Sequence, residues 1–176
     1  DQYKKFQDKI IYKVIENFPN NLSNWERENF QRNFIQNGLH EASRDDYIII
    51  SDVDEIPNLS NISSNLKNKY TIFEQKMSYY KLNLFNTTFP IWFGSKMCKK
   101  KYLKSPQWLR NQKVKNYSFL KFFKIKWNII NNGGWHFSFL MYPDEIKKKI
   151  KSFAHDEFNK TEYLNVDKID KSIKQG

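Results

Sequence analysis

The sequence contains one cysteine, Cys98, among 176 residues. A single thiol excludes an intrachain disulfide and any zinc cluster built from cysteines. Long apolar runs are also missing, because no stretch approaches the roughly 20 residues that a membrane-spanning helix needs. The first residues lack the hydrophobic core of a signal peptide, and no repeat or low-complexity linker divides the chain. The length therefore favours one domain with a single substantial core.

Acidic residues are outnumbered by basic ones. The chain has 30 Lys and Arg against 19 Asp and Glu, a formal net charge of +11 and a pI near 9.5. The densest clusters are residues 99–101 and residues 147–149 with Lys151. Such clusters are commonly solvated faces, although a basic surface also suits an anionic donor, phospholipid head groups or an acidic partner. The charge thus permits membrane-surface association through these basic patches, and no recognisable RNA-binding motif points to a nucleic-acid partner.

The most informative stretch runs from Tyr47 to Pro57. A β-branched apolar run, residues 48–50, ends abruptly in Asp52, Asp54 and Glu55. The run predicts a strand buried on both faces, as in a parallel sheet, with the acids at its carboxyl end, where open α/β sheets bind ligands. Carboxylates held close together repel unless a cation lies among them, and a hard divalent metal can also bind a substrate phosphate. The alternative is that Ser51-Asp52 merely caps a following helix.

The remaining pattern predicts alternating strands and helices. The capping-box sequence at residues 23–26 opens a helix, and the strands before and after it suggest a right-handed crossover. Ser105 and Pro106 open a further helix. The predicted strands cover residues 9–15, 47–51, 70–77, 91–98, 126–130 and 135–140, and the predicted helices cover residues 24–36, 59–66, 105–110, 142–153 and 166–174.

A second candidate part of the site is the glycine pair at residues 133 and 134. Two glycines allow a tight turn and close approach of the backbone to a ligand. Trp135 offers a flat apolar face for a sugar ring, and His136 alternates with it across the strand, so at most one of the two points into a given pocket. The alternative is a plain hairpin turn followed by a core tryptophan and a structural histidine.

A third candidate cluster follows the helix predicted at residues 142–153. His155 could complete a metal site begun by Asp54, and Asp156 or Glu157 could act as a general base on a sugar hydroxyl. The alternative is a helix end at which the histidine offsets the negative end of the helix dipole.

Together these motifs resemble glycosyltransferase family 17, the family of the bisecting N-acetylglucosaminyltransferase. The resemblance rests on residues 28–32, 51–57, 133–138 and 151–155, in that order, and extends from about Lys9 onward. It implies a GT-A-like α/β fold with a central, mostly parallel sheet flanked by helices. It also implies inverting transfer of a sugar, typically N-acetylglucosamine from UDP, to a glycan acceptor in β linkage. Family members usually carry an upstream segment with the first sheet strand. Residues 1–176 are therefore expected to be the larger, C-terminal part of a longer catalytic domain, and donor binding and activity would depend on that segment.

The resemblance also implies roles for individual residues. Metal ligands for Mn²⁺ or Mg²⁺ would be Asp52, Asp54 and His155. The catalytic base would be Glu145 first, then Asp144, with Asp156 and Glu157 as alternatives. Asp52, Gly133, Gly134 and Trp135 would lie near the UDP-sugar or the acceptor. Apart from the resemblance, the residues themselves offer His136 as a further contact to the donor and Arg110 or Lys96 as a cationic clamp on the diphosphate, the alternative being that either is an ordinary surface cation.

Other functions compatible with the sequence are a metal-dependent nuclease or phosphatase, which also gathers acids at strand ends, and a non-catalytic glycan- or nucleic-acid-binding module. The location in the cell would be the cytoplasm for a bacterial or viral protein and the Golgi lumen for a eukaryotic one. The oligomeric state is not indicated.

Overall fold

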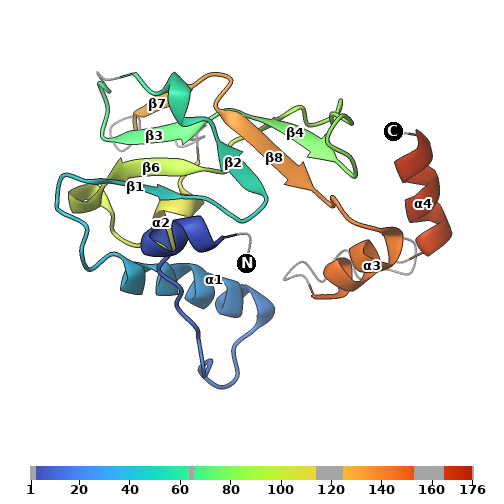
Figure 1. Cartoon of the computed structure of the whole chain (residues 1–176), viewed down its shortest axis with the longest axis horizontal. Coiled ribbons are helices and arrows are strands. Elements are labelled where there is room, and N and C mark those ends of the chain that lie inside the picture. The colour runs from blue at the N-terminus through green and yellow to red at the C-terminus, as the bar shows by residue number, and fades with distance from the viewer. Residues whose placement is uncertain (1–2, 64–65, 114–124, 153–164, 176) are drawn as a thin grey trace, which may run out of the picture.

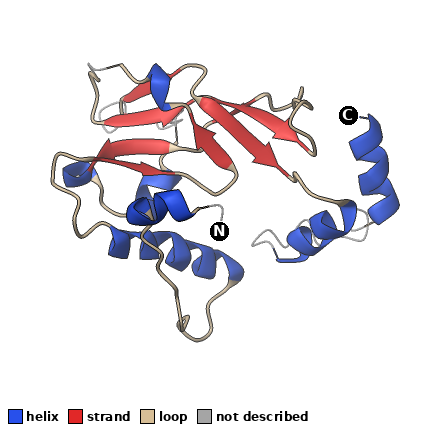
Figure 2. Ribbon diagram, viewed as in Figure 1, coloured by secondary structure: helices blue, strands red, loops and turns tan. Residues whose placement is uncertain are grey.

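The protein is a mixed α/β structure with two four-stranded sheets and helices at its edges (Figures 1 and 2). The computed structural model describes residues 3–63, 66–113, 125–152 and 165–175. No helix in these ranges is long and apolar enough to cross a membrane.

The first sheet has the strand order β1-β6-β3-β7. Its strands are β1 (Tyr47–Ile50), β3 (Tyr70–Phe73), β6 (Lys96–Lys99) and β7 (Trp127–Ile130). Only β3 and β7 pair in parallel, whereas β6 is antiparallel to both β1 and β3.

The second sheet has the order β2-β8-β4-β5. Its strands are β2 (Glu55–Pro57), β4 (Gln75–Tyr79), β5 (Ile91–Trp92) and β8 (Gly134–Ser138). Here β4 and β8 are parallel, and the other two pairings are antiparallel.

Each pass of the chain contributes one strand to each sheet, and every pass bends where the sheets meet. Backbone hydrogen bonds join the bends: the Glu74 amide donates to the Ile130 carbonyl at 3.0 Å, the Gly133 amide to the Glu74 carbonyl at 2.7 Å, and the Phe73 amide to the Ser95 carbonyl at 3.1 Å. The acidic residues between β1 and β2 lie at one of these bends. The junction of the two sheets, rather than one sheet edge, therefore positions the candidate site.

The helices form two groups, one at each sheet. Helix α1 (Asn24–Phe34) has the predicted capping box at Ser23 and Glu26, and α2 (Pro106–Asn111) has the predicted Ser105 cap. Figure 1 shows α2 beside β1 and α1 on the far side of α2, whereas α3 (Pro143–Ser152) and α4 (Val166–Gln175) lie beyond the second sheet. Short 3₁₀ turns occupy Lys4–Lys9, Ile35–Gly38, Leu59–Asn61 and Lys100–Tyr102.

Three apolar clusters hold these elements together. Leu109 of α2 packs with Ile48 and Ile50 on one side of the first sheet, and Phe73, Met97 and Ile130 pack together on β3, β6 and β7. The third cluster, formed by Ile146, Ile150 and Ile169, joins α3 to α4. The helix pair thus has a small separate core, against which Tyr80 and Phe139, directly after β4 and β8, also pack.

Several predictions about the sheets are wrong. Residues 9–15 form no strand, because this β-branched segment runs exposed without a pairing partner among the described residues, and the predicted crossover does not form. The central sheet is not mostly parallel, since four of the six strand pairings are antiparallel. Strand β1 is an edge strand whose Ile49 is only partly buried, and the strands predicted at 70–77 and 91–98 are each divided in two by the bend between the sheets.

Candidate active site

The site is built around the turn between β1 and β2. The Glu55 amide donates to the Asp52 carbonyl at 3.0 Å, which closes the turn, and Val53 between the two aspartates is fully exposed. The turn therefore separates the side chains of Asp52 and Asp54. Although β1 is antiparallel to its neighbour, the acids still follow its end, as the sequence predicted.

Glu55 is the buried centre of this turn, with only 5 % of its surface exposed. Its carboxylate accepts hydrogen bonds from Trp92 Nε1 at 2.6 Å, from Ser95 Oγ at 3.2 Å and from two nitrogens of Arg110 at 2.5 and 2.9 Å. Burial alone would raise the pKa of Glu55, but the hydrogen bonds and charge of Arg110 and the bond from Trp92 outweigh it, so the pKa is lowered. Glu55 is therefore held ionised in the interior.

Asp52 is held by two arginines from two helices. Arg110 of α2 donates to its Oδ2 at 2.7 Å, and Arg32 of α1 donates to its Oδ1 at 3.2 and 3.3 Å. Arg32 also binds Glu28 at 2.8 Å and Gln107 at 2.5 Å. Both carboxylate oxygens of Asp52 are thus engaged by guanidinium groups.

Arg110 is itself positioned from below by Lys96, a buried residue of β6 that donates from Nζ to the Arg110 carbonyl. Burial, together with the nearby charge of Arg110, lowers the pKa of Lys96 to about 8. The pKa of Arg110 is raised, because its ion pairs with Glu55 and Asp52 outweigh the cost of burial. The sequence predicted that Arg110 or Lys96 could bind a diphosphate. In the structure Arg110 binds Asp52 and Glu55 instead, and Lys96 holds the backbone of Arg110.

Asp54 has a different environment. Its side chain is 27 % exposed, with His136 Nε2 at 3.6 Å from Oδ1 and Lys149 Nζ at 3.5 Å from Oδ2. Burial alone would raise the pKa of Asp54, but the interaction with His136 and the charges of His136 and Lys149 lower it overall. Asp54 is therefore an ionised carboxylate that faces solvent and has no arginine among its described partners.

His136 joins this carboxylate to the aromatic side chains next to it. Its ring stacks on Trp92 at 4.9 Å between centroids with an interplanar angle of 25°. Within the described ranges its Nδ1 is buried without a hydrogen-bond partner, whereas metal-binding histidines generally have a partner for that second nitrogen. This favours His136 as a neighbour that positions Asp54 over His136 as a metal ligand.

The described residues fit part of a divalent-cation site. They contain no group of three or more His, Cys, Asp and Glu side chains that could hold a metal. Mg²⁺ and similar ions, however, commonly use one or two carboxylates together with substrate phosphates. Asp54 suits that role because it is ionised and has no arginine among its described partners, whereas the Asp52 side chain, although more exposed (36 % against 27 %), has both oxygens bound by arginines. The predicted ligand His155 and the alternative bases Asp156 and Glu157 lie outside the described residues.

The predicted glycine pair lies at the junction of the two sheets. An added methyl at Gly133 would overlap the backbone of Ile130 and Glu74, and one at Gly134, whose φ is +129°, would overlap the Ile56 carbonyl. Close packing of the backbone therefore explains both glycines without a ligand. Trp135 is 41 % exposed on the face of the second sheet opposite His136.

The predicted bases Asp144 and Glu145 open helix α3 and are both exposed. Glu145 Oε2 accepts a hydrogen bond from the Tyr142 amide at 2.9 Å, as a capping residue does. It precedes Lys149 by one helical turn, so the two side chains are neighbours on the helix surface. Because Lys149 contacts Asp54, the surface of α3 that carries Glu145 faces the acidic turn.

Sequence reasoning missed several residues that shape this site, among them Trp92, Gly94 and Lys149. Gly94 lies directly under the contact between Glu55 and Trp92, and an added methyl would overlap both side chains. Its only signal in the sequence is a glycine two residues before β6. Lys149 had appeared only as a member of a basic cluster, and nothing in the sequence indicated that it reaches a residue 95 positions away.

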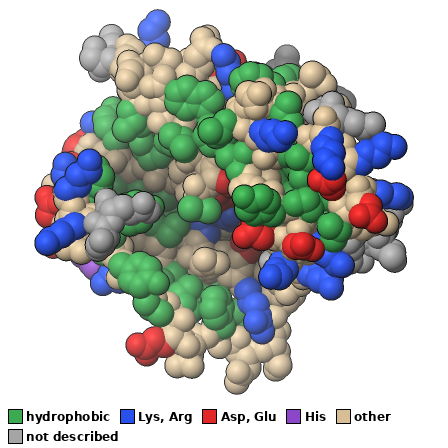
Figure 3. All heavy atoms as spheres, turned by 45° about the vertical axis from the view of Figure 1, so that its right-hand side comes forward, with side chains coloured by type: hydrophobic (Ala, Val, Ile, Leu, Met, Phe, Trp, Pro, Cys, Tyr) green, Lys and Arg blue, Asp and Glu red, His purple; other side chains and the backbone are tan. Residues whose placement is uncertain are grey.

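Figure 3 shows one face of the molecule, on which hydrophobic side chains gather around a recess and acidic and basic side chains lie close together at one side. Comparison with curated proteins and with solved structures gave no match. The family model for glycosyltransferase family 17 matches residues 1–176, the whole chain. The chain therefore belongs to glycosyltransferase family 17.

Proposed function

We propose that this glycosyltransferase is an inverting, metal-dependent enzyme of GT-A type that transfers N-acetylglucosamine from UDP-N-acetylglucosamine to a glycan in β linkage. The observation that carries the proposal is the contrast within the acidic turn. Asp52 and Glu55 are bound by arginines, whereas Asp54 is ionised, partly exposed and free of arginine among its described partners. Asp54 is the carboxylate best placed to meet a cation that also binds the donor diphosphate.

The proposed roles follow from this placement. Asp54, with His155 beyond the described residues, would hold Mn²⁺ or Mg²⁺, and Lys149 would add a positive charge on the diphosphate side. When bound, the metal supplies Lewis-acid stabilisation of the charge that develops on the leaving diphosphate. Asp52 would act through the arginines, by fixing the turn that carries Asp54.

The proposed transfer requires one base. The acceptor hydroxyl oxygen bonds to the anomeric carbon, and the bond from that carbon to the diphosphate oxygen breaks with its electron pair leaving on UDP. The hydroxyl proton passes to the carboxylate of Glu145. Attack opposite the leaving group inverts the anomeric centre without a covalent enzyme intermediate. The position of Glu145, one turn from the lysine that reaches Asp54, supports this choice over Asp144.

A two-metal nuclease or phosphatase receives less support. Such enzymes hold two ions a few ångströms apart, which requires several converging ligands. Within the described residues no group of three or more candidate ligands exists. Asp52 and Glu55, the nearest further acids, are neutralised by arginines.

Donor binding is tested by thermal shift and calorimetry with UDP-N-acetylglucosamine, with and without Mn²⁺. A donor at a hundredfold excess over its Kd stabilises the folded state by about 2.7 kcal/mol, so a shift of several degrees is expected only when the metal is present. Asp54→Asn should abolish the shift. Asp45→Asn, at an exposed acid bound by lysines, is the control and should keep it. Metal-dependent donor binding that survives Asp54→Asn would remove the basis of the proposal.

The base is tested by turnover rather than by binding. Glu145→Gln preserves a capping oxygen and should leave donor binding unchanged, while transfer falls by about 10²- to 10⁴-fold. Asp144→Asn, in the same first turn of α3, is the matched control and should retain transfer. Equal losses in both variants would indicate an effect on the helix start instead of on proton transfer. NMR of the product distinguishes β from α linkage.

A further inference from the structure

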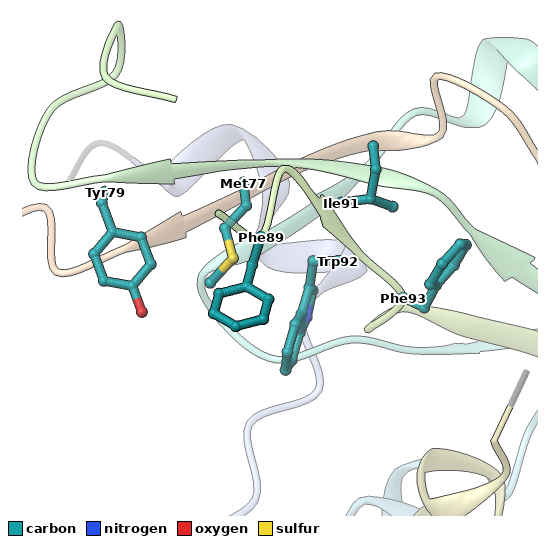
Figure 4. Close-up of a pocket in the computed structure, with 6 residues that line it drawn as sticks. All are labelled: Met77, Tyr79, Phe89, Ile91, Trp92 and Phe93. Atoms are coloured by element: carbon teal, nitrogen blue, oxygen red, sulfur yellow. The ribbon is translucent and has the colours of Figure 1, made fainter. Parts of the chain in front are cut away.

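An aromatic hollow lies on the second sheet, on the face that carries Glu55 and His136. It has a volume of about 490 Å³, within the range of small-molecule sites, and its lining is mostly aromatic. The lining residues are Met77, Tyr79, Phe89, Ile91, Trp92 and Phe93. In Figure 4, Met77, Tyr79, Phe89 and Trp92 project to the same side of the strands, whereas Ile91 points the other way.

The strand register explains why the hollow and the acidic turn share this face. Met77 of β4 pairs with His136 of β8, and Glu55 of β2 also pairs with His136, so the three side chains point to one side of the sheet. Trp92 of β5 pairs with Gln75, two residues from Met77, and therefore joins them. The face is continuous from β2 to β5.

Trp92 is the wall that the hollow shares with the acidic turn. Its Nε1 donates to Glu55 at 2.6 Å, its ring stacks on His136, and the Arg110 guanidinium lies 6.0 Å from the ring centroid. His136 in turn approaches Asp54. A molecule in the hollow would therefore lie against the ring that adjoins the proposed donor site.

The most exposed wall of the hollow is held in place. Phe89 is 68 % exposed, yet the side-chain oxygen of Asn86 accepts hydrogen bonds from the Thr88 and Phe89 amides at 2.9 and 2.8 Å. The Asn86 amide donates to the Met77 carbonyl at 2.9 Å and fastens this loop to β4. These bonds fix the backbone at Phe89, whose ring joins Ile91, Trp92 and Phe93 in a contiguous exposed apolar patch, and such patches mark binding surfaces.

The chemistry of the lining indicates the ligand. All six side chains are uncharged, so the hollow offers no counter-ion to a phosphate or a carboxylate. A pyranose ring presents a flat C–H face that matches aromatic rings, and its hydroxyls can remain in water at an open rim. Given the transferase function proposed above, we propose that the aromatic hollow binds a neutral sugar ring of the acceptor glycan. The diphosphate and the transferred sugar belong at Asp54, on the other side of His136 and Trp92.

The test compares two exposed phenylalanines of one loop. Phe89→Ala removes a wall of the hollow, whereas Phe85→Ala, the control, removes a ring of similar exposure that does not line it. Saturation-transfer NMR is recorded with chitotriose, lactose and mannotriose in the presence of UDP and Mn²⁺. At least one saccharide should bind the unmodified protein and the control, with the signal reduced at least fivefold in Phe89→Ala. UDP binding, measured separately by calorimetry, should be the same in all three proteins.

The outcomes separate this inference from the proposed function. If UDP binds but none of the saccharides does, or if Phe89→Ala binds them as well as the control, the hollow is not an acceptor site. Phe89-dependent retention on phosphatidylcholine vesicles without saccharide binding would identify a bilayer contact and also overturn the inference. If saccharides bind through Phe89 while UDP does not bind at all, the donor proposal fails and the hollow remains a glycan site.

Discussion

The two sides of the acidic turn differ in what surrounds their carboxylates. On the arginine-bound side, Asp52 and Glu55 receive guanidinium groups from α1 and α2, and Glu55 is buried. On the open side, Asp54 lies beside a histidine and a lysine and remains accessible to solvent. Both sides belong to one turn of four residues.

Within this one turn, the arginine-bound carboxylates are expected to contribute to folding stability, and Asp54 is expected to bind ligands. A buried carboxylate paired with arginine is costly to disturb, because removing one partner leaves the other charge without compensation. An accessible carboxylate beside a lysine can exchange that lysine for a ligand at little cost. Substitutions on the two sides should therefore have opposite profiles, one affecting folding and the other affecting binding.

Glu55→Gln should have the largest effect on folding. It leaves the buried Arg110 guanidinium without its main counter-charge, and breaking a buried ion pair in this way costs about 3–5 kcal/mol. Urea unfolding followed by circular dichroism measures the loss. Asp45→Asn breaks an exposed pair with Lys99 and Lys101 and should leave the unfolding midpoint unchanged. Equal midpoints for both variants would mean that Glu55 does not anchor the turn.

Gly94→Ala should have the next largest effect. The added methyl overlaps both Glu55 and Trp92, and such overpacking costs about 1–3 kcal/mol. Displacement of the indole should also change tryptophan emission. Gly38→Ala is the matched control, because its methyl would meet Ile11 at an ordinary 3.8 Å. Unaltered emission and stability in Gly94→Ala would show that the contact beneath Trp92 is loose.

Lys96 should give the stability a dependence on alkaline pH. Its pKa is about 8 in the folded protein, against an ordinary value of 10.5, so the folded state binds fewer protons than the unfolded state between these values. Stability from this group therefore rises as pH increases through that window, by at most about 3 kcal/mol. In Lys96→Met the rise should be absent. Parallel stability curves for the two proteins from pH 8 to 10 would contradict the prediction.

Lys149→Met should have the smallest effect on folding and should affect metal binding instead. The ion pair with Asp54 is partly exposed, and such pairs contribute about 1 kcal/mol or less. Because the lysine competes with a cation for this carboxylate, its removal should tighten Mn²⁺ binding by about two- to fivefold without donor present. Calorimetry with Mn²⁺ alone measures this. Weaker Mn²⁺ binding would instead show that the lysine helps to build the site.

Most local signals were read correctly from the sequence, whereas long-range ones were not. One local prediction is wrong, because the helix expected at 59–66 is only a 3₁₀ turn at Leu59–Asn61 among the described residues. The capping box of α1, the Ser105 cap of α2 and the strand before the acids were all predictable, because neighbouring residues determine them. The bend that divides the strand predicted at 70–77 carries no glycine or proline and is fixed by hydrogen bonds to the turn at 131–133. Residues 9–15 have strand propensity, but propensity does not supply a pairing partner.

The division of labour in the acidic turn could not be predicted for the same reason. The sequence treated Asp52 and Asp54 as equivalent metal ligands. The arginines that distinguish them come from positions 32 and 110, on helices brought together by the packing of α1 against α2. Ion pairs between residues so far apart leave no local pattern.

Each pass of the chain contributes a strand to both sheets, and this affects how the protein unfolds locally. Neither sheet can lose its strands without pulling on the other, so amide protons of both should exchange with solvent in one cooperative event. The pair α3–α4 has its own small apolar cluster and should exchange earlier. Since α3 carries Lys149 to Asp54, separation of this pair would uncover the open side of the turn while the arginine-bound side stays folded.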